Sequence, residues 1–256
     1  MKFTLPLFLF PILSLALRPL PRSRTGVTEH VTLNLRPGIS LETTNADVQD
    51  KAFQIIGSWP GFQDGYWGLE LGDAPRTAYW FYSITPISPL PPPMGHQVNQ
   101  PMIDWDSVAT HQAFAQSAEY PATIEAVEFL ASSFSAPHVP LQPFPPNEVF
   151  ASSPVVSWVT FNLTGVANDT ATKVNWQTMA DGFLGNLTSV SGCGVYSSGW
   201  EVEDGRVFSV LIGWESAEAL GAFVISRRFV EDFGRLVSGV VWEYRVLRVA
   251  GYVPKL

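Results

Sequence analysis

The chain has 256 residues, of which 46% are hydrophobic and 13% aromatic, and its formal net charge is −8 at pH 7. This length and apolar fraction allow one large hydrophobic core or two modest ones. Because Lys and Arg together number only 15, the chain lacks the basic surface that nucleic acids and anionic membranes attract. We therefore expect no nucleic-acid partner.

The first residues have the pattern of a secretory leader. Met1-Lys2 precedes an apolar run over residues 3–17, which has the charge and length of a signal peptide and is too short to span a bilayer comfortably. We expect a signal peptide or leader over residues 1–26, a secreted or secretory-lumen location, and no membrane span after its removal. An unprocessed leader is the alternative. Three glycosylation sequons agree with a secreted glycoprotein, at Asn162, Asn168 and Asn186.

Cys193 is the only cysteine. A single thiol excludes an internal disulfide and a thiolate metal cluster. Its setting, Gly192-Cys193-Gly194, contains no base or cation that would lower the thiol pKa. We expect a small buried side chain rather than a nucleophile.

The sequence contains two similar halves. Residues 27–35 align with residues 155–163 at an offset of 128. Residues 103–107 align with residues 212–216 at an offset of 109. The second offset continues into the following segment, where Ala113-Phe114 and Ser117 correspond to Ala222-Phe223 and Ser226. The difference of 19 is an insertion over residues 84–102. A unit of about a hundred residues is too long for a solenoid repeat and indicates two small domains.

The first half predicts six elements in chain order. Alternation of apolar and polar residues predicts strands, and apolar residues at helical spacing predict helices. The expected ranges are a strand at 29–35, a helix at 45–58, a hairpin of strands at 65–71 and 77–83, a helix from Asp106 or Ser107 to about 132, and a strand at 139–144.

The second half predicts the same order, with a Pro-rich linker at 145–154 between the two. Its expected ranges are a strand at 155–163, a helix at 172–187, strands at 193–200 and 206–214, a helix at 216–236 and a strand at 240–249. Strand, helix, strand, strand, helix, strand is the ferredoxin-like pattern, which leaves one face of its sheet uncovered. We predict an α+β fold of two such repeats, residues 27–144 and 155–250, packed sheet to sheet within one monomer.

The insertion at 84–102 is rich in proline, which cannot extend a sheet, so we expect an exposed loop. A lid over a pocket, a passive surface excursion and a gene-model error in which an intron was translated all fit this composition.

These residues resemble a known family. The strand at 27–35 with Arg36-Pro37-Gly38, and Trp105-Asp106-Ser107 with its counterpart Trp214-Glu215-Ser216 ahead of a helix, are similar to the dimeric α+β barrel superfamily. Within it, the antibiotic-biosynthesis-monooxygenase-like (ABM-like) proteins of fungi are most similar. The resemblance covers residues 27–249 and implies ligand sites between each sheet and its helices. It does not choose among oxygenases, cyclases, dehydratases, haem-degrading enzymes and proteins without an assigned role.

Given this resemblance, the first half has more aromatic and polar residues suited to a site than the second half. We expect His111, which corresponds to Leu220 and therefore faces inward, to be the catalytic proton acceptor. A buried structural histidine is the alternative. The expected substrate-binding residues share an aromatic or hydrogen-bonding side chain near it, and are Asn34, Trp67, Tyr79, Tyr82 and Trp105. Asn34 belongs to a polar row with His30 and Thr32, which is either a hydrogen-bonded network or a pocket wall.

The expected function is a cofactor-independent tailoring step, of monooxygenase or cyclase type, on an aromatic small molecule of fungal secondary metabolism. The alternative is a non-catalytic secreted or lumenal protein that binds a hydrophobic ligand. No nucleotide motif is present, and His96 and His138 show no spacing that predicts a metal. Asn34, Trp105 and His111 do not reproduce the spacing of the haem-degrading branch. We therefore expect no cofactor.

Overall fold

The computed structural model describes residues 26–59, 62–71, 77–84, 108–143, 146–165 and 169–254. The expected leader, Trp105 and all of the insertion beyond Ile84 lie outside these ranges. The first half consists of β1 (Val27–Leu35), α1 (Ala46–Ser58), β2 (Phe62–Glu70), β3 (Thr77–Ile84), α2 (Val108–Ala115), α3 (Tyr120–Leu130), β4 (Ala131–Ser135) and β5 (His138–Val139). The second half consists of α4 (Asn147–Ala151), β6 (Val155–Asn162), a 3-10 turn (Leu163–Gly165), α5 (Thr170–Leu187), β7 (Cys193–Trp200), β8 (Val207–Trp214), α6 (Ala217–Val224), α7 (Arg227–Leu236) and β9 (Val241–Pro254).

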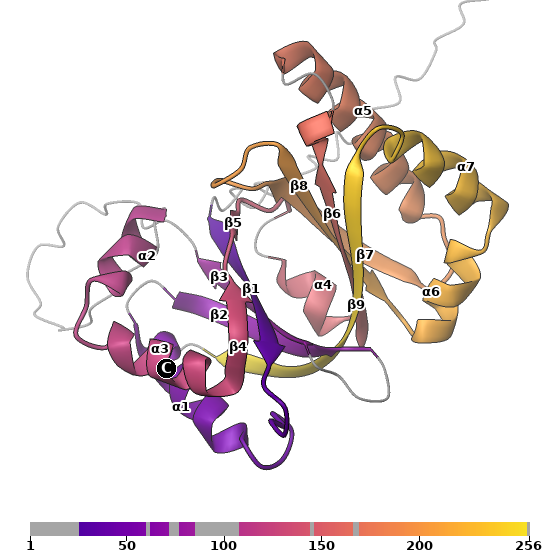
Figure 1. Cartoon of the computed structure of the whole chain (residues 1–256). Helices are drawn as coiled ribbons and strands as arrows, with labels where there is room; N and C mark the ends of the chain where they lie inside the picture. Colours follow the sequence, from indigo (N-terminus) through magenta and orange to yellow (C-terminus); the bar gives the residue numbers. More distant parts are fainter. Residues whose placement is uncertain are drawn as a thin grey trace, which may run out of the picture.

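The two halves share one strand order. The first sheet runs β4-β1-β3-β2 and the second β9-β6-β8-β7, and every pairing is antiparallel. The 14 residues of β9 pair with β6 along its first part and with β2 along its last part, which joins the sheets (Figure 1). At the opposite edge, Gln142 pairs with Ser198 of β7. The predicted fold class, two ferredoxin-like units in an α+β arrangement, is confirmed.

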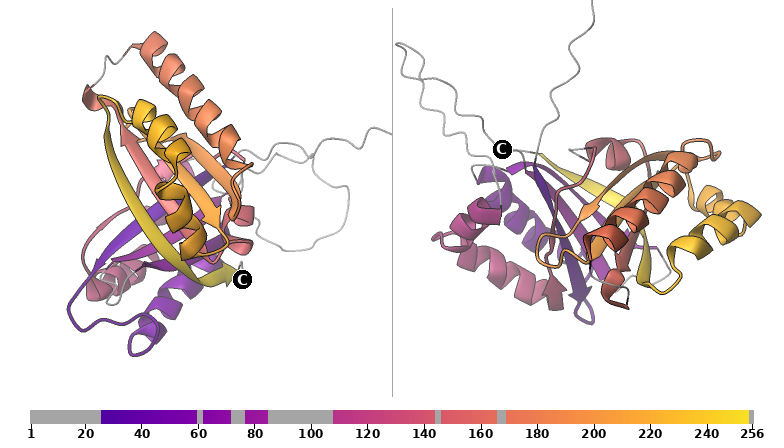
Figure 2. Two further views of the ribbon diagram at one scale, coloured as in Figure 1. Left: turned by 90° about the vertical axis from the view of Figure 1, so that its right-hand side faces the viewer. Right: turned by 90° about the horizontal axis from the view of Figure 1, so that it is seen from above.

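Three apolar cores hold these layers together. One lies between the first sheet and α1 and α3, a second lies between the second sheet and α5 to α7, and a third lies between the two sheets. The two helical layers therefore lie on opposite outer sides, with the strands between them (Figure 2). The expected linker contains α4, which sits between the sheets, where the Phe150 ring stacks on Tyr66 at 4.9 Å.

The prediction of one long helix ahead of the last strand was wrong in both units. Each is two helices, α2 and α3 in the first unit and α6 and α7 in the second. The corresponding serines stand at the two breaks, where Ser117 Oγ accepts the N–H of Tyr120 at 3.3 Å and Ser226 Oγ accepts the N–H of Phe229 at 3.2 Å. Ser226 is the N-cap of α7, whereas α3 begins after Glu119, where Pro121 favours a helix start.

The last strand of the first unit was also predicted in the wrong place. It begins directly after α3, as β4, and continues in the two residues of β5 instead of covering 139–144. The β4 sequence, Ala-Ser-Ser-Phe-Ser, has little intrinsic strand preference. Pairing with β1, for example Leu33 with Phe134, fixes it in the sheet. Among the described residues, no helix combines the length and the hydropathy needed to cross a membrane.

Candidate functional site

A cavity lies in the first unit between the sheet and its helices. Its inner volume is about 80 Å³, and its free space including the mouth is about 610 Å³. The inner volume has room for several waters, and the larger figure includes open solvent at the mouth. The walls are mostly apolar and aromatic, and are formed by Glu29, Val31, Ile56, Trp80, His111, Phe114, Tyr120, Thr123, Ile124, Val127, Phe134 and Ala136.

Strand alternation decides which side chains reach this cavity. Along β1, Glu29 and Val31 face the helices, whereas His30 faces the other sheet and contacts Trp158. Val31 pairs with Trp80 of β3, so Trp80 faces the helices as well. The neighbouring Tyr79 points to the opposite side. Glu29 is therefore a carboxyl group on an otherwise apolar face of the strand.

One corner of the cavity is polar. His111 Nε2 of α2 lies 3.5 Å from Glu29 Oε1, and their side chains are 21% and 13% exposed. The His138 ring lies 4.8 Å from the His111 ring, centroid to centroid. His138 is paired with Glu29 across β5 and β1, which places it beside the same corner. We call Glu29, His111, His138 and Glu203 the polar corner.

The second unit contributes one residue of this corner. Glu203, in the loop between β7 and β8, has Oε1 2.5 Å from His138 Nδ1, and its Oε2 accepts the His138 backbone N–H at 2.9 Å. The N–H of Val202 donates to the His138 carbonyl at 2.9 Å. The His138 side chain is only 5% exposed, and the second unit therefore helps to fix its orientation.

Burial dominates the electrostatics of the corner. Burial raises the pKa of Glu29 to about 8, with the Glu203 charge acting in the same direction. Burial also lowers the pKa of His111 to about 4, with a further contribution from His138. Burial alone would raise the pKa of Glu203, but the hydrogen bonds from His138 outweigh it, and the pKa is lowered. At neutral pH the corner holds a neutral His111 imidazole beside a protonated Glu29.

The same corner has the donor types of a metal site. Glu29, His111 and His138 each offer one ligand atom, and these three atoms lie within 4.8 Å of one another. Two imidazoles and a carboxylate are a common ligand set for divalent transition metals. The sequence spacing of His138 predicted no metal, because only the fold brings β1, α2 and β5 together.

The expected site residues lie in different parts of the structure. His111 lines the cavity. Tyr79 lies in the core between the sheets, where its ring contacts Trp158, and Asn34 donates a 2.9 Å hydrogen bond to the exposed Ser133. Trp67 packs against the helix-side core but is not part of the cavity wall. Trp105 and the Tyr82 side chain lie outside the described part of the chain.

His30, in the polar row on β1, takes part in neither of the expected arrangements. His30 is fully buried between Phe81 and Trp158, which it meets edge to face at ring distances of 5.2 and 5.0 Å. Neither ring nitrogen has a hydrogen-bond partner among the described residues. Burial lowers the pKa of His30 to about 3, so the ring is neutral. It fills the core between the sheets.

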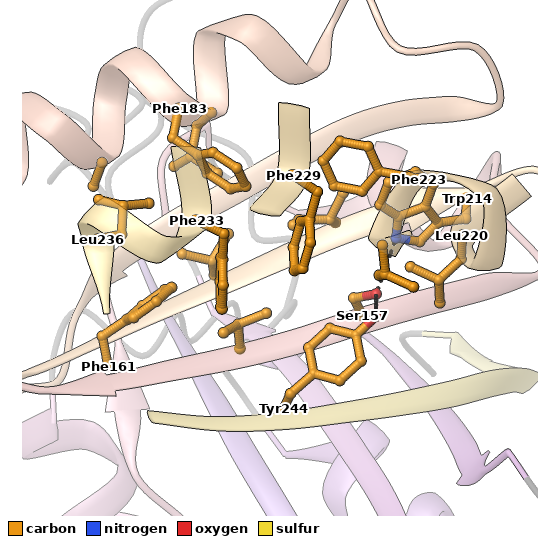
Figure 3. A pocket seen from close by; sticks show the side chains of 16 residues that line it. Ser157, Phe161, Phe183, Trp214, Leu220, Phe223, Phe229, Phe233, Leu236 and Tyr244 are labelled. Carbon is orange, nitrogen blue, oxygen red and sulfur yellow. Dashed lines mark hydrogen bonds between the residues drawn. The ribbon is translucent and has the colours of Figure 1, made fainter. Parts of the chain in front are cut away.

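The second unit has a smaller counterpart of the cavity, with an inner volume of about 20 Å³ (Figure 3). Leu220 and Ser157 stand where His111 and Glu29 stand in the first unit, and both line it. Ser157 accepts the indole N–H of Trp214 at 3.0 Å and lies 3.2 Å from the Tyr244 hydroxyl. Phe223 of α6 and Phe229 and Phe233 of α7 also line it. Polar chemistry is thus concentrated in the first unit.

Sequence reasoning missed most of the polar corner. Glu29 could have been found, because it is a carboxylate on the strand face shared by Val31 and Leu33. His138 and Glu203 gave no such signal, since they are 65 residues apart and belong to different units. Trp80 is one of four consecutive aromatic residues of β3, and only the register shows that it lies in the cavity wall.

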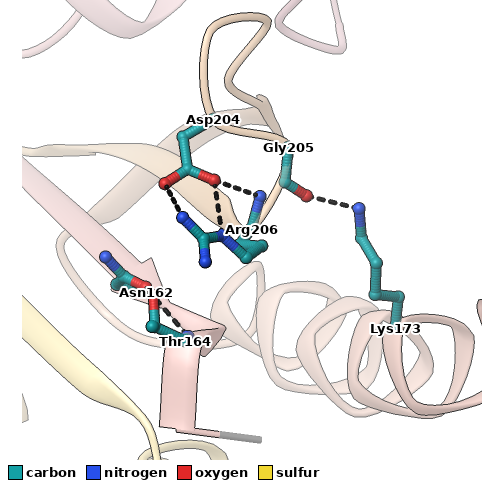
Figure 4. Close-up of polar contacts among 6 residues, drawn as sticks. All are labelled: Asn162, Thr164, Lys173, Asp204, Gly205 and Arg206. Atoms are coloured by element: carbon teal, nitrogen blue, oxygen red, sulfur yellow. Dashed lines mark hydrogen bonds and ion pairs between the residues drawn. The ribbon is translucent and has the colours of Figure 1, made fainter. Parts of the chain in front are cut away.

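Two other sequence features have a structural setting. Asn162, of the first sequon, lies at the end of β6 beside the loop of Asp204 and Arg206, where its Oδ1 accepts the Thr164 N–H at 2.9 Å (Figure 4). It is not part of either cavity wall. Cys193 is partly buried, and burial raises its thiol pKa to about 11. Its thiol is therefore protonated at neutral pH.

Comparison with known proteins gives structural likeness at low sequence identity. No protein-family model matches the chain, and no curated protein matches its sequence. An anthrone oxidase-like protein superposes with a TM-score of 0.62 at 10% identity, over 89% of this chain and 92% of that one. A monooxygenase candidate of Fusobacterium nucleatum superposes with a TM-score of 0.58 at 7% identity, over 91% of this chain and 95% of that one. Another monooxygenase candidate, of Lactobacillus acidophilus, superposes with a TM-score of 0.55 at 11% identity, over 90% of this chain and 97% of that one.

Identity at this level shows the fold and not the activity. The match extends over both units of this chain in all three cases. Together with the strand order and the joined sheets, it places the chain in the dimeric α+β barrel fold, with both ferredoxin-like units in one polypeptide.

Proposed function

We propose that the chain is an oxygenase-type tailoring enzyme that acts on a small aromatic molecule in the cavity of the first unit. The observation that carries this proposal is the cavity itself, in which aromatic walls meet a polar corner containing Glu29 and His111. An apolar pocket with a few convergent polar groups is the usual form of a small-molecule site. The names of the structural neighbours, which include monooxygenases and an anthrone oxidase-like protein, support the same class of reaction.

The reaction that fits this corner begins with removal of a proton from the substrate. For an anthrone, loss of a proton from the ring CH₂ gives an anion that reduces O₂. One oxygen atom becomes the new ketone, the other leaves as water, and anthrone plus O₂ becomes anthraquinone plus water. The substrate supplies the electrons, so the balance needs no added reductant. His111 is the proton acceptor in this proposal, and Glu29 at 3.5 Å is the group that positions it.

The apolar walls have a separate role. Trp80, Phe114 and Tyr120 offer ring faces and edges to an aromatic substrate. Exclusion of water by these side chains strengthens the interaction between the substrate anion and the corner.

The experiment measures oxygen uptake by the purified chain with an anthrone and related phenolic polycyclic compounds. We expect His111→Asn to lower kcat by about 100-fold or more, the usual contribution of a general base. Ala136→Trp should abolish turnover because Ala136 lines the cavity, and Ala118→Trp is the matched control on an exposed turn outside it. Turnover that survives both His111→Asn and Ala136→Trp would contradict the proposal. Binding of these compounds without oxygen uptake would favour a ligand-binding protein instead.

A further inference from the structure

We propose that the polar corner binds one divalent first-row transition-metal ion through Glu29, His111 and His138. This inference rests on the geometry of the corner and goes beyond the proposed function. The ligand atoms of the three residues lie within 4.8 Å of one another, and the Glu29 and His111 atoms lie 3.5 Å apart. Ligands about 2.1 Å from a tetrahedral ion are about 3.4 Å from each other, so one pair already has the required spacing. The other separations, all within 4.8 Å, must close by at most about 1.4 Å.

The second observation concerns how His138 is held. Glu203 Oε1 lies 2.5 Å from His138 Nδ1, and the His138 backbone N–H donates to the same carboxylate. A carboxylate that holds one nitrogen of an imidazole orients the ring and leaves the lone pair on the other nitrogen, as in carboxylate–histidine–zinc sites. His138 Nε2 is buried and has no hydrogen-bond partner among the residues that the structure describes. Its orientation is therefore fixed while one of its polar atoms is unsatisfied.

The ligand types of the corner suit a dication. Two carboxylates, Glu29 and Glu203, lie close to two imidazoles, and the ion pairs of the described residues join neither carboxylate to a Lys or Arg. A buried carboxylate without a fixed cation is costly, and a bound metal ion removes that cost. The ligand types, two nitrogens and one oxygen, suit Zn²⁺, Co²⁺ and Fe²⁺ better than Mg²⁺ or Ca²⁺.

The arrangement also leaves room for a ligand on the ion. Glu29 and His111 line the cavity, and His138 is not one of its lining residues. An ion bound to all three therefore keeps its open position toward the aromatic cavity, as catalytic sites with three protein ligands do. A phenolate oxygen or a water molecule is the ligand that this position fits.

The test is a titration of the full chain, freed of metal by EDTA and dialysis, with Co²⁺ followed by visible absorption. We expect one Co²⁺ per chain, displaced by Zn²⁺, which prefers tetrahedral sites of nitrogen and oxygen ligands. His111→Ala and Glu29→Gln should each weaken binding by about 100-fold or more. Glu203→Gln, which keeps all three ligands, should weaken it by about 10- to 100-fold.

His96→Ala is the control for adventitious binding, because His96 lies outside the corner's four residues. It should bind Co²⁺ as the wild-type chain does. Circular dichroism verifies that each variant is folded, and Zn²⁺ should raise the midpoint of thermal unfolding of the wild-type chain more than that of Glu29→Gln. Absence of Co²⁺ binding at about 100 µM, binding unchanged by both ligand replacements, or binding lost in His96→Ala would each overturn the inference.

These readouts need no substrate, so they are independent of the proposed function. With an ion bound, His111 is a ligand instead of a proton acceptor. Oxygen uptake measured with and without metal therefore separates the two proposals. A chain that binds no metal but turns over an anthrone overturns only the metal inference.

Discussion

Single residues show how closely related positions can acquire different roles. Glu29 and Ser157 occupy the same place on the first strand of their units, and each is a polar residue of its cavity wall. His30 and Trp158 also correspond, and the two rings meet edge to face in the core between the sheets. The first pair faces the helices and the second pair faces the other unit. Adjacent residues on one strand therefore serve a site and an interface.

Cys193 gives a prediction at the residue scale. Burial raises the pKa of its thiol to about 11, so at pH 8 its thiolate fraction should be more than about 100-fold below that of a free cysteine with a pKa near 8.5. Alkylation by iodoacetamide should be correspondingly slow. Its rate should rise about tenfold per pH unit well above pH 8.5, where that of a free thiol levels off. The same chain in urea is the control, and a rate equal to that of the unfolded chain would show that the thiol is not buried.

At the scale of elements, the helix breaks explain how each helical layer follows its sheet. Two short helices replace one long helix in both units, and the change of direction lies at Ser117 and Ser226. In the first unit the break separates α2, which carries His111, from α3, which carries Tyr120 and Thr123. Both helices consequently line the cavity from different directions.

Ser226→Ala tests the role of these caps. Ser226 Oγ accepts the N–H of Phe229 at the start of α7, and its loss should lower the free energy of unfolding by about 1 kcal/mol. Ser58→Ala is the control, because Ser58 is exposed and its hydroxyl donates to Ile55 O of its own helix. Urea denaturation measures both. Equal stability of the two variants would argue against the cap.

At the scale of the whole molecule, the two units depend on each other. Their sheets share the core that contains Trp158, Phe81 and Phe150, and they are joined by the pairing of β2 with β9. The polar corner also needs both units, because Glu203 of the second unit orients His138 of the first. A single unit would expose its interface and lack part of its site.

Gly68→Ala tests the junction between the units. A Cβ at Gly68 would lie 2.6 Å from the backbone oxygen of Arg248 on β9, so the strands must move apart. We expect a loss of at least about 2 kcal/mol in the free energy of unfolding. Gly182→Ala is the matched control within α5, where a Cβ meets nothing within 4 Å. It should stabilise the chain by about 0.5–1 kcal/mol, as measured by urea denaturation. A neutral Gly68→Ala would mean that β2 and β9 do not pair closely.

The sequence by itself determined the order of most elements and the division into two similar units. Periodicity and turn residues are local signals, and they placed β1, α1, β6, α5 and the hairpin of β7 and β8 within a few residues of their observed ends. The inward position of His111 also followed from a local comparison with Leu220. The strand β4 did not, because its Ser-rich sequence is a strand only through pairing with β1.

Only the tertiary structure decided the composition of the site. Strand register placed Trp80 in the cavity and Tyr79 in the core between the sheets, although the two are neighbours in an aromatic run. Closure of the two sheets brought Glu203 to His138 and both of them to Glu29 and His111. Contacts between residues so far apart in the chain depend on how the elements pack, and no local pattern of residues encodes them.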